Sequence, residues 1–178
     1  MARLLSLNMP SMCVFNGETK ACGYYLGLCH DTRIISEESG SICNSELRAG
    51  IPLPFSYLQV LSSSLPQMVI IKLLGGDTWD QYDSQRLGLV DNSYQDQTDL
   101  DKQICEFAQC HMDATDEDRF LLKESKVHKH EHLLETLRFF RIEGDAYFLY
   151  KKCHEKLQQA FFNVNFRRKL VRQQRPRL

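Results

Sequence analysis

Long apolar runs are missing from this sequence. No stretch approaches the roughly 20 apolar residues of a membrane-spanning helix, and the apolar segment in residues 1–15 is too short for a convincing secretory signal. An excess of charge is also missing, because 22 basic residues nearly balance 23 acidic residues. No overall field then attracts nucleic acid or a membrane surface. These absences predict an intracellular protein with no membrane contact.

Recognisable catalytic motifs are also missing. The glycine pair in residues 73–77 (LLGGD) lacks the Lys-Ser/Thr of a phosphate-binding loop, and no serine lies in a G-x-S-x-G elbow. Residues 113–119 (DATDEDR) lack the central glycine and the distal glutamate of an EF-hand calcium loop. The sequence therefore predicts a protein that is not an enzyme and that binds no cofactor.

Metal-ligand spacing is scarce as well. None of the seven cysteines forms a Cys-x-x-Cys pair, which favours free thiols over a zinc knuckle or a disulfide framework. His128 and His132 are four residues apart, a spacing that on one helix can present two imidazoles to a metal. The alternative is a solvated helix face shared with neighbouring lysines and glutamates. The sequence favours this alternative and predicts no metal site.

The first fifty residues have the pattern of a small β unit. Apolar residues make up 43% of the chain, enough to bury a core. Met12–Phe15 predicts a strand, and Asn16-Gly17 predicts a turn that brings back residues 22–26 (CGYYL) as its hairpin partner. Residues 33–36 (RIIS) predict a further strand.

A joint follows this β unit. Residues 48–61 (RAGIPLPFSYLQVL) place a glycine and two prolines before an apolar run. Proline costs little in a first helical turn, because the amide it lacks has no partner there. Leu53, Pro54, Phe55 and Leu61 are therefore predicted to form a domain joint at the start of a helix.

The segment after the joint gives mixed signals. The β-branched run 68–74 (MVIIKLL) is bounded by two glycines, and strand is favoured over buried helix. Asp77 is then predicted to cap a short helix.

Three clear helices are predicted in the second half of the chain. The first begins at Thr98, where Asp101 resembles the partner of a capping box. The second begins near Thr115 and runs to Gly144, and Asp145 caps the third. The predicted fold class is α+β: a small β-rich domain over residues 1–50, a mainly α-helical bundle domain over residues 51–165, and a basic tail over residues 166–178.

The third helix has a wider apolar surface than one two-helix contact uses. Such a surface suits a partner interface, although a central position in a monomeric bundle explains it equally well. The predicted interface residues are Phe148, Leu149, Tyr150, Leu157, Phe161 and Phe162.

The tail carries a cluster of basic side chains with almost nothing apolar between them. Such a run can act as a nuclear-localisation segment or contact phosphates, and a solubilising helix end explains it as well. The basic residues named for this tail are Arg167, Arg168, Lys169, Arg172 and Arg175.

The joint (ELRAGIPLPFSYLQVL) resembles the GINS replication complex family, specifically its third Psf subunit. In that family the joint reads Leu-Pro-x-Trp-Leu-Ala-x-x-Leu; here Leu53, Pro54 and Leu61 match and Ser56 replaces the tryptophan. The opening stretch MPSMCVFNGETKACGYYLG and the closing stretch LLETLRFFRIEGDAYFLYKKCHEKLQQAFF are also similar to the family.

This resemblance implies a β-rich domain followed by a helical one. It also implies a non-catalytic subunit of a nuclear heterotetramer, whose partners are its sister subunits and the MCM helicase in DNA replication. Nucleic acid would be contacted weakly or indirectly. Two alternatives stay open: a monomeric metal- or nucleic-acid-binding module, and a pathogen protein that binds host partners.

Overall fold

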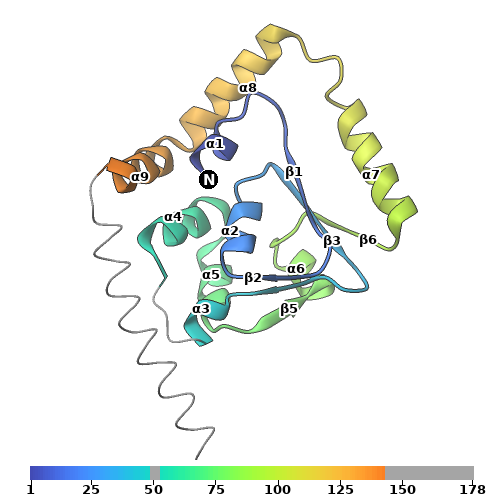
Figure 1. Ribbon diagram of the computed structural model, residues 1–178, viewed down its shortest axis with the longest axis vertical. Coiled ribbons are helices and arrows are strands. Elements are labelled where there is room, and N and C mark those ends of the chain that lie inside the picture. Colours follow the sequence, from blue (N-terminus) through green and yellow to red (C-terminus); the bar gives the residue numbers. More distant parts are fainter. Residues whose placement is uncertain (49–52, 143–178) are drawn as a thin grey trace, which may run out of the picture.

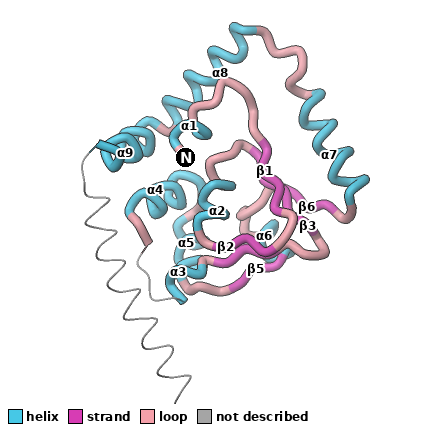
Figure 2. Tube along the Cα trace, viewed as in Figure 1, coloured by secondary structure: helices cyan, strands magenta, loops and turns pink. Residues whose placement is uncertain are grey.

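The computed structural model describes residues 1–48 and 53–142, except the side chains of residue 47 and residues 139–142 (Figure 1). Short strands and helices alternate in the first part of the chain, and helices alone follow (Figure 2). The elements are α1 Ala2–Leu5, β1 Met12–Phe15, β2 Glu18–Lys20, α2 Cys22–Gly27, β3 Thr32–Ser36, β4 Ser41–Cys43, α3 Ser45–Arg48, α4 Phe55–Ser64, α5 Gln67–Leu74, β5 Thr78–Asp80, α6 Gln81–Arg86, β6 Asn92–Tyr94, α7 Gln97–Gln109, α8 Asp116–Lys129 and α9 Glu131–Ile142.

The chain forms two small sheets, and its first four strands alternate between them. The order of one sheet is β1-β3-β6, all parallel, and the order of the other is β2-β4-β5. In the second sheet β2 and β4 are parallel, and β5 is antiparallel to β4. Each pair of consecutive strands, β1–β2 and then β3–β4, therefore contributes one strand to each sheet.

This alternation makes the predicted hairpin at Asn16-Gly17 wrong. The turn connects strands of different sheets, and Met12 of β1 pairs with Thr32 of β3 instead. The strands predicted at residues 12–15 and 33–36 are confirmed.

Two segments predicted as strands are helices. Residues 22–26 lie in α2, where Tyr24 and Tyr25 are buried. Residues 68–74 lie in α5, where Val69 and Leu73 face the core at helical spacing. Tertiary packing outweighs the β-propensity of these aromatic and branched side chains.

Three helices, α6, α7 and α8, begin at side-chain caps, and two of the predicted caps are displaced. Asp80 rather than Asp77 caps α6. Asp96 rather than Thr98 caps α7, and its carboxylate accepts from the Asp99 amide at 2.8 Å. Thr115 begins α8 as predicted, with a complete capping box to Asp118. The helix expected to run on to residue 144 is interrupted at His130.

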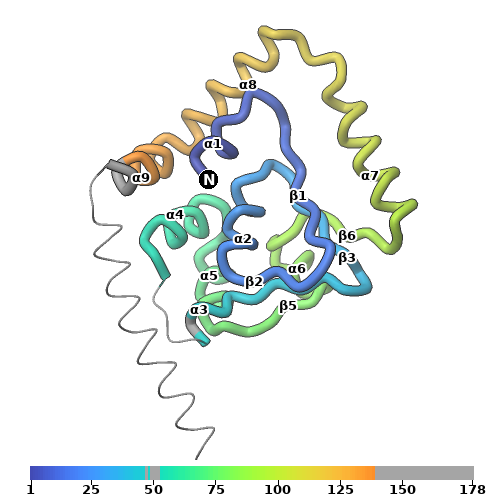
Figure 3. Tube along the Cα trace, in the orientation of Figure 1, coloured from blue at the N-terminus to red at the C-terminus, as the bar shows by residue number. Residues whose placement is uncertain are grey.

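One hydrophobic cluster connects the sheets to the helices on both sides of residue 50. Helix α9 packs against both α4 and α1, and Figure 3 shows the orange end of the described chain beside its blue start. Fully buried members of the cluster include Tyr25, Ile35, Ile42, Leu61, Leu73 and Leu89.

The chain is a mixture of α and β structure, and the predicted bundle of helices is not confirmed. Both sheets draw strands from before and after residue 50. The proposed division at that residue stays a prediction. The predicted interface at residues 148–162 and the basic tail lie outside the described residues. None of the helices in residues 1–48 and 53–142 has the length and apolar character needed to span a bilayer.

Candidate functional site

The candidate site lies where two parallel strands end. Lys20, the last residue of β2, pairs with Cys43, the last residue of β4. One residue after each strand a helix begins, α2 at Cys22 and α3 at Ser45. Ligand sites favour the carboxyl edge of parallel strands, because loops and helix starts gather there. We call this the β2–β4 edge.

The backbone is strained at the turn between β2 and α2. Ala21 has φ 53° and ψ −127°, and it is the only non-glycine residue with positive φ in the described chain. Its amide donates to the Cys43 carbonyl oxygen at 3.1 Å, which holds the turn against β4. The first amides of the following helix, those of Cys22 and Gly23, have no partner within the helix. Strain of this kind persists where the surrounding structure imposes it, often at functional sites.

Replacing Ala21 by glycine should raise the free energy of unfolding by about 1 kcal/mol. Glycine adopts positive φ without a steric cost, and the relief of strain is expected to outweigh the extra entropy of the unfolded chain. Urea denaturation of wild type and A21G measures the difference. A21V places a branched side chain at the same strained position and should lower the free energy of unfolding. Equal stability of wild type, A21G and A21V would show that the backbone at Ala21 is not strained.

Glu46 supplies a carboxylate at this edge. It lies in α3, two residues after Asn44, and its Oε2 atom is buried without a hydrogen-bond partner in the described chain. Desolvation raises the pKa of Glu46 above its ordinary value. A partly desolvated carboxylate with a free oxygen is well suited to accept a proton from a bound molecule.

Two stacked tyrosines lie within electrostatic range of Glu46. The rings of Tyr25 and Tyr57 stack with their centroids 4.5 Å apart. Burial raises the pKa of both phenols, and the negative charge of Glu46 raises them further. The Tyr25 hydroxyl donates to Asn44 Oδ1 at 2.9 Å, while Asn44 Nδ2 is buried without a partner among the described residues. The influence of Glu46 on both phenols shows that the two rings lie within electrostatic range of its carboxylate.

An open groove reaches the same helix start. It has a volume of about 520 Å³ and is lined by the chain from Cys13 to Lys20 and by Gly23. The groove runs along β1 and β2 to Gly23 in the first turn of α2.

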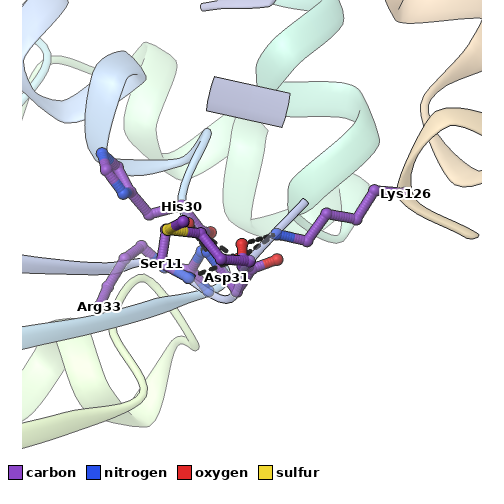
Figure 4. A network of polar contacts seen from close by, with 6 residues as sticks. Ser11, His30, Asp31, Arg33 and Lys126 are labelled. Carbon is purple, nitrogen blue, oxygen red and sulfur yellow. Dashed lines mark hydrogen bonds and ion pairs between the residues drawn. The ribbon is translucent and has the colours of Figure 1, made fainter. Parts of the chain in front are cut away.

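A second polar cluster lies at the opposite end of α2 (Figure 4). Lys126, whose side chain is 8% exposed, bonds Asp31 Oδ2 at 2.6 Å and the Met9 carbonyl oxygen at 2.8 Å. Ser11 donates to the same carboxylate oxygen through its amide and its hydroxyl, each at 2.8 Å. Burial opposes ionisation of Asp31, but these hydrogen bonds outweigh it and hold its pKa below the ordinary value. The cluster connects α8 to the turn before β3.

The sequence-predicted site residues do not gather at the β2–β4 edge as a group. Pro54 is the N-cap of α4 as expected and Leu61 is buried, while the role of Leu53, Pro54, Phe55 and Leu61 as a domain joint stays a prediction. His128 and His132 belong to different helices, so they do not share one helix face. In the part of the chain that the structure describes, no group of three or more His, Cys, Asp or Glu side chains could hold a metal.

Comparison with known proteins finds similarity to proteins named as enoyl-CoA isomerases and hydratases. No family model matches the sequence. Over 100 residues the chain is 32% identical to the Arabidopsis thaliana protein named Enoyl-CoA delta isomerase 3. This matched region makes up 54% of this chain and 41% of that protein. The chain thus spans about two fifths of this curated relative.

The solved structures that match the chain are also named as enoyl-CoA isomerases or hydratases. The apo enoyl-CoA isomerase of Mycobacterium tuberculosis matches with a TM-score of 0.67 at 20% identity, over 77% of this chain and 59% of that one. An enoyl-CoA hydratase of Mycobacterium marinum matches with the same TM-score, identity and coverage. An enoyl-CoA hydratase of Bacillus halodurans matches with a TM-score of 0.64 at 13% identity, over 88% of this chain and 57% of that one. The chain has the crotonase-like fold of these enzymes.

These findings overturn the resemblance to the GINS family. The relatives are isomerases and hydratases by name, so the prediction of a non-catalytic replication subunit is wrong. Sister subunits and the MCM helicase are not supported as partners, and neither alternative, a binding module or a host-binding pathogen protein, is supported.

The sequence interpretation missed the residues of the β2–β4 edge. Residues 22–26 were assigned to a strand, which hid the helix start, and Glu46 was considered only as part of the joint stretch ELRAGIPLPFSYLQVL. The available signal was the repeat of a short strand followed at once by a helix-compatible segment, after Lys20 and after Cys43.

Proposed function

We propose that this chain contributes the proton-transfer site of an enzyme that shifts a carbon–carbon double bond in an acyl-CoA thioester. Glu46 is the general base and acid. The observation that carries the proposal is the buried, unpartnered Oε2 of Glu46 at the carboxyl edge of two parallel strands. The curated relative named an isomerase supports the reaction class.

The proposed reaction is a proton shuttle by one carboxyl group. The Glu46 carboxylate removes a proton from C2 of a β,γ-unsaturated acyl thioester, and the C–H electron pair moves into the conjugated dienolate. The protonated Glu46 then returns the proton to C4, which yields the α,β-unsaturated thioester and restores the carboxylate. Since the same group receives and releases the proton, no second base is required.

The negative charge of the dienolate resides mainly on the thioester oxygen. The amides of Cys22 and Gly23, at the turn held by Ala21, are the proposed donors to this oxygen. Donors fixed before substrate arrives stabilise developing charge without reorganisation. The strained Ala21 would serve to aim these amides.

The groove along β1 and β2 is the proposed path of the thioester's elongated chain. Its lining includes Gly23, so a molecule lying in it reaches the proposed donors. Tyr25 and Tyr57 then limit water at the reacting carbons and keep the proton on Glu46 between the two transfers.

The test is an assay of the purified full chain with a β,γ-unsaturated acyl-CoA of medium length. Formation of the conjugated product, followed by its ultraviolet absorbance, is the expected result. Water addition to an α,β-unsaturated acyl-CoA is measured in parallel, because hydratases share the fold. Hydration without isomerisation would contradict the proposed reaction.

The turnover rate should depend on pH through Glu46. The carboxylate form is required to remove the proton, so the rate falls as pH decreases through the pKa of Glu46. Burial raises this pKa above the ordinary glutamate value of 4.5, and the midpoint of the fall should therefore lie above pH 4.5. Measurement of kcat against pH with saturating substrate tests this; a rate that stays constant down to pH 4.5 would contradict Glu46 as the base.

The proposed nuclear location rested on the overturned resemblance and on the basic tail. The basic tail still predicts nuclear import, and fusion of residues 166–178 to a reporter protein tests it: accumulation of the reporter in the nucleus is the expected result.

A further inference from the structure

A cavity of about 160 Å³ lies at the far end of α2 from Glu46. Tyr57 senses the charges of both Glu46 and Cys22, which begins α2, whereas the cavity is lined by residues that follow the end of that helix. Residues from α4 and from the junction of α8 and α9 complete it. Its polar lining residues are His30, Arg33, Ser63, Ser64, Lys129 and His130.

Three nitrogen atoms in this lining are buried and have no hydrogen-bond partner among the described residues. They are His30 Nδ1, Arg33 Nε and His130 Nδ1. The arginine nitrogen is always a donor, and each imidazole nitrogen is a donor when the ring is protonated. Buried polar atoms are normally paired, so three orphans around one cavity indicate a missing acceptor.

The acidic group nearest to the cavity is already neutralised. Asp31 lines the cavity, but its carboxylate bonds Lys126 at 2.6 Å and Ser11 at 2.8 Å. Figure 4 shows the His30 ring directed away from this pair. The terminal nitrogens of Arg33 are also engaged, with Asp91 at 3.2 Å and with the His30 carbonyl oxygen at 3.2 Å. The lining therefore has a surplus of unpartnered nitrogen atoms, namely Arg33 Nε and the Nδ1 atoms of His30 and His130.

We propose that this cavity binds a tetrahedral oxyanion, either free inorganic phosphate or the phosphate group of an ester. Oxygen atoms on such an anion can accept from His30, Arg33 and His130 at the same time. Lys129 is exposed at the rim, where it adds positive charge at the entrance. The volume exceeds that of several water molecules, which is sufficient for a group of five heavy atoms.

Protonation of the two histidines couples anion binding to pH. Burial lowers the pKa of His30, with Arg33 and Lys126 adding to the effect and Asp31 opposing it. Burial likewise lowers the pKa of His130, with Lys129 and Lys126 adding and Asp31 opposing. A bound anion favours the protonated rings, so affinity should rise as pH decreases.

Sulfate is the first probe, because its charge is constant over the range in which histidine titrates. Calorimetric titration of the full chain should show binding at about pH 5.5 that is about tenfold weaker at about pH 8. H130Q keeps a hydrogen-bonding side chain but loses the titrating ring, and it should weaken binding and flatten the pH dependence. K129Q, at an exposed position, should weaken sulfate binding several-fold at both pH values.

K123Q is the matched control, because Lys123 is an exposed residue of the same helix outside the cavity. It should bind sulfate as wild type does. Circular dichroism verifies that each variant is folded. Absence of sulfate binding to folded wild type at about pH 5.5, or equal binding by H130Q, K129Q and wild type, would overturn the proposal.

Competition then identifies the source of the anion. Displacement of sulfate by inorganic phosphate but not by methyl phosphate indicates a free-anion site. Displacement by both indicates a site that accepts a phosphate ester. The readout is binding at a cavity remote from Glu46, so its outcome is independent of whether the chain isomerises acyl-CoA.

Discussion

Replacing Glu46 by glutamine is expected to lower kcat for double-bond migration by about 10²–10⁴-fold. Glutamine preserves the size of the side chain and its hydrogen-bonding capacity but cannot take up a proton. The thioester should still bind, so KM should change far less than kcat. Steady-state kinetics with a β,γ-unsaturated acyl-CoA separate the two constants.

The same substitution should leave the protein at least as stable as wild type at neutral pH. The pKa of Glu46 is higher in the folded protein than in the unfolded chain, so the folded state loses stability as pH rises through this pKa. Removing the ionisable group removes that loss. Catalytic groups commonly reduce stability in this way.

E106Q is the control for this experiment. Glu106 is an exposed residue of α7, and the Lys102 Nζ atom lies 3.9 Å from its carboxylate. This variant should retain wild-type kcat and stability. If E46Q lost activity only because it unfolded, thermal denaturation would reveal it, and the assignment of Glu46 as base would fail.

Replacing Lys126 by methionine should lower the free energy of unfolding by about 2–3 kcal/mol. The substitution leaves the Met9 carbonyl without its donor and leaves the Asp31 carboxylate with Ser11 alone. Lys126 is buried whereas the Asp31 side chain is 36% exposed, so the cost comes mainly from the two hydrogen bonds of Lys126 Nζ and from the partly buried Met9 carbonyl interaction that nothing replaces. Urea denaturation measures the change.

K123M is the matched control for K126M. Lys123 is exposed one turn earlier in α8, and its replacement should change stability by less than about 0.5 kcal/mol. Acid provides an independent check, because the lowered pKa of Asp31 gives stability that is lost as pH falls through that pKa. Equal stability of K126M and K123M would show that the Asp31–Lys126 pair does not hold α8 in place.

Local signals in the sequence were sufficient for part of the fold. The strands at residues 12–15 and 33–36, the helix start at Pro54 and the helix start at Thr115 all follow from short-range chemistry. A fixed proline φ and a side-chain cap act within a few residues, so sequence alone reveals them.

The pairing of the strands and the burial of side chains could not be predicted from such local signals, because both depend on residues far apart in the sequence. Residues 22–26 resemble a strand in sequence because tyrosine favours β-sheets. In the structure they form a helix that is covered on several sides, which buries the adjacent side chains of Tyr24 and Tyr25. An Asn-Gly turn suggests a hairpin, but only the positions of β3 and β4 show that the two strands it connects enter different sheets. These long-range choices also decided the site, since Glu46 acquires its environment from Tyr25 and Tyr57.

The family resemblance failed for a related reason. It rested on the joint at residues 48–61 and on the similarity of an opening and a closing stretch, and a proline-marked helix start like the one in this joint occurs in many folds. Here Pro54 begins α4, which packs against α2 and α9 within the cluster that also contains the sheets.

The most direct test of the account follows one proton through the reaction. A β,γ-unsaturated acyl-CoA deuterated at C2 is converted by the full chain in ordinary water, and the position of the label is determined by NMR. A shuttle by Glu46 predicts that a measurable fraction of the deuterium appears at C4 of the product of the wild-type protein and that E46Q forms product at least about 10²-fold more slowly. Turnover by E46Q at the wild-type rate, or no turnover by either protein, would contradict the account.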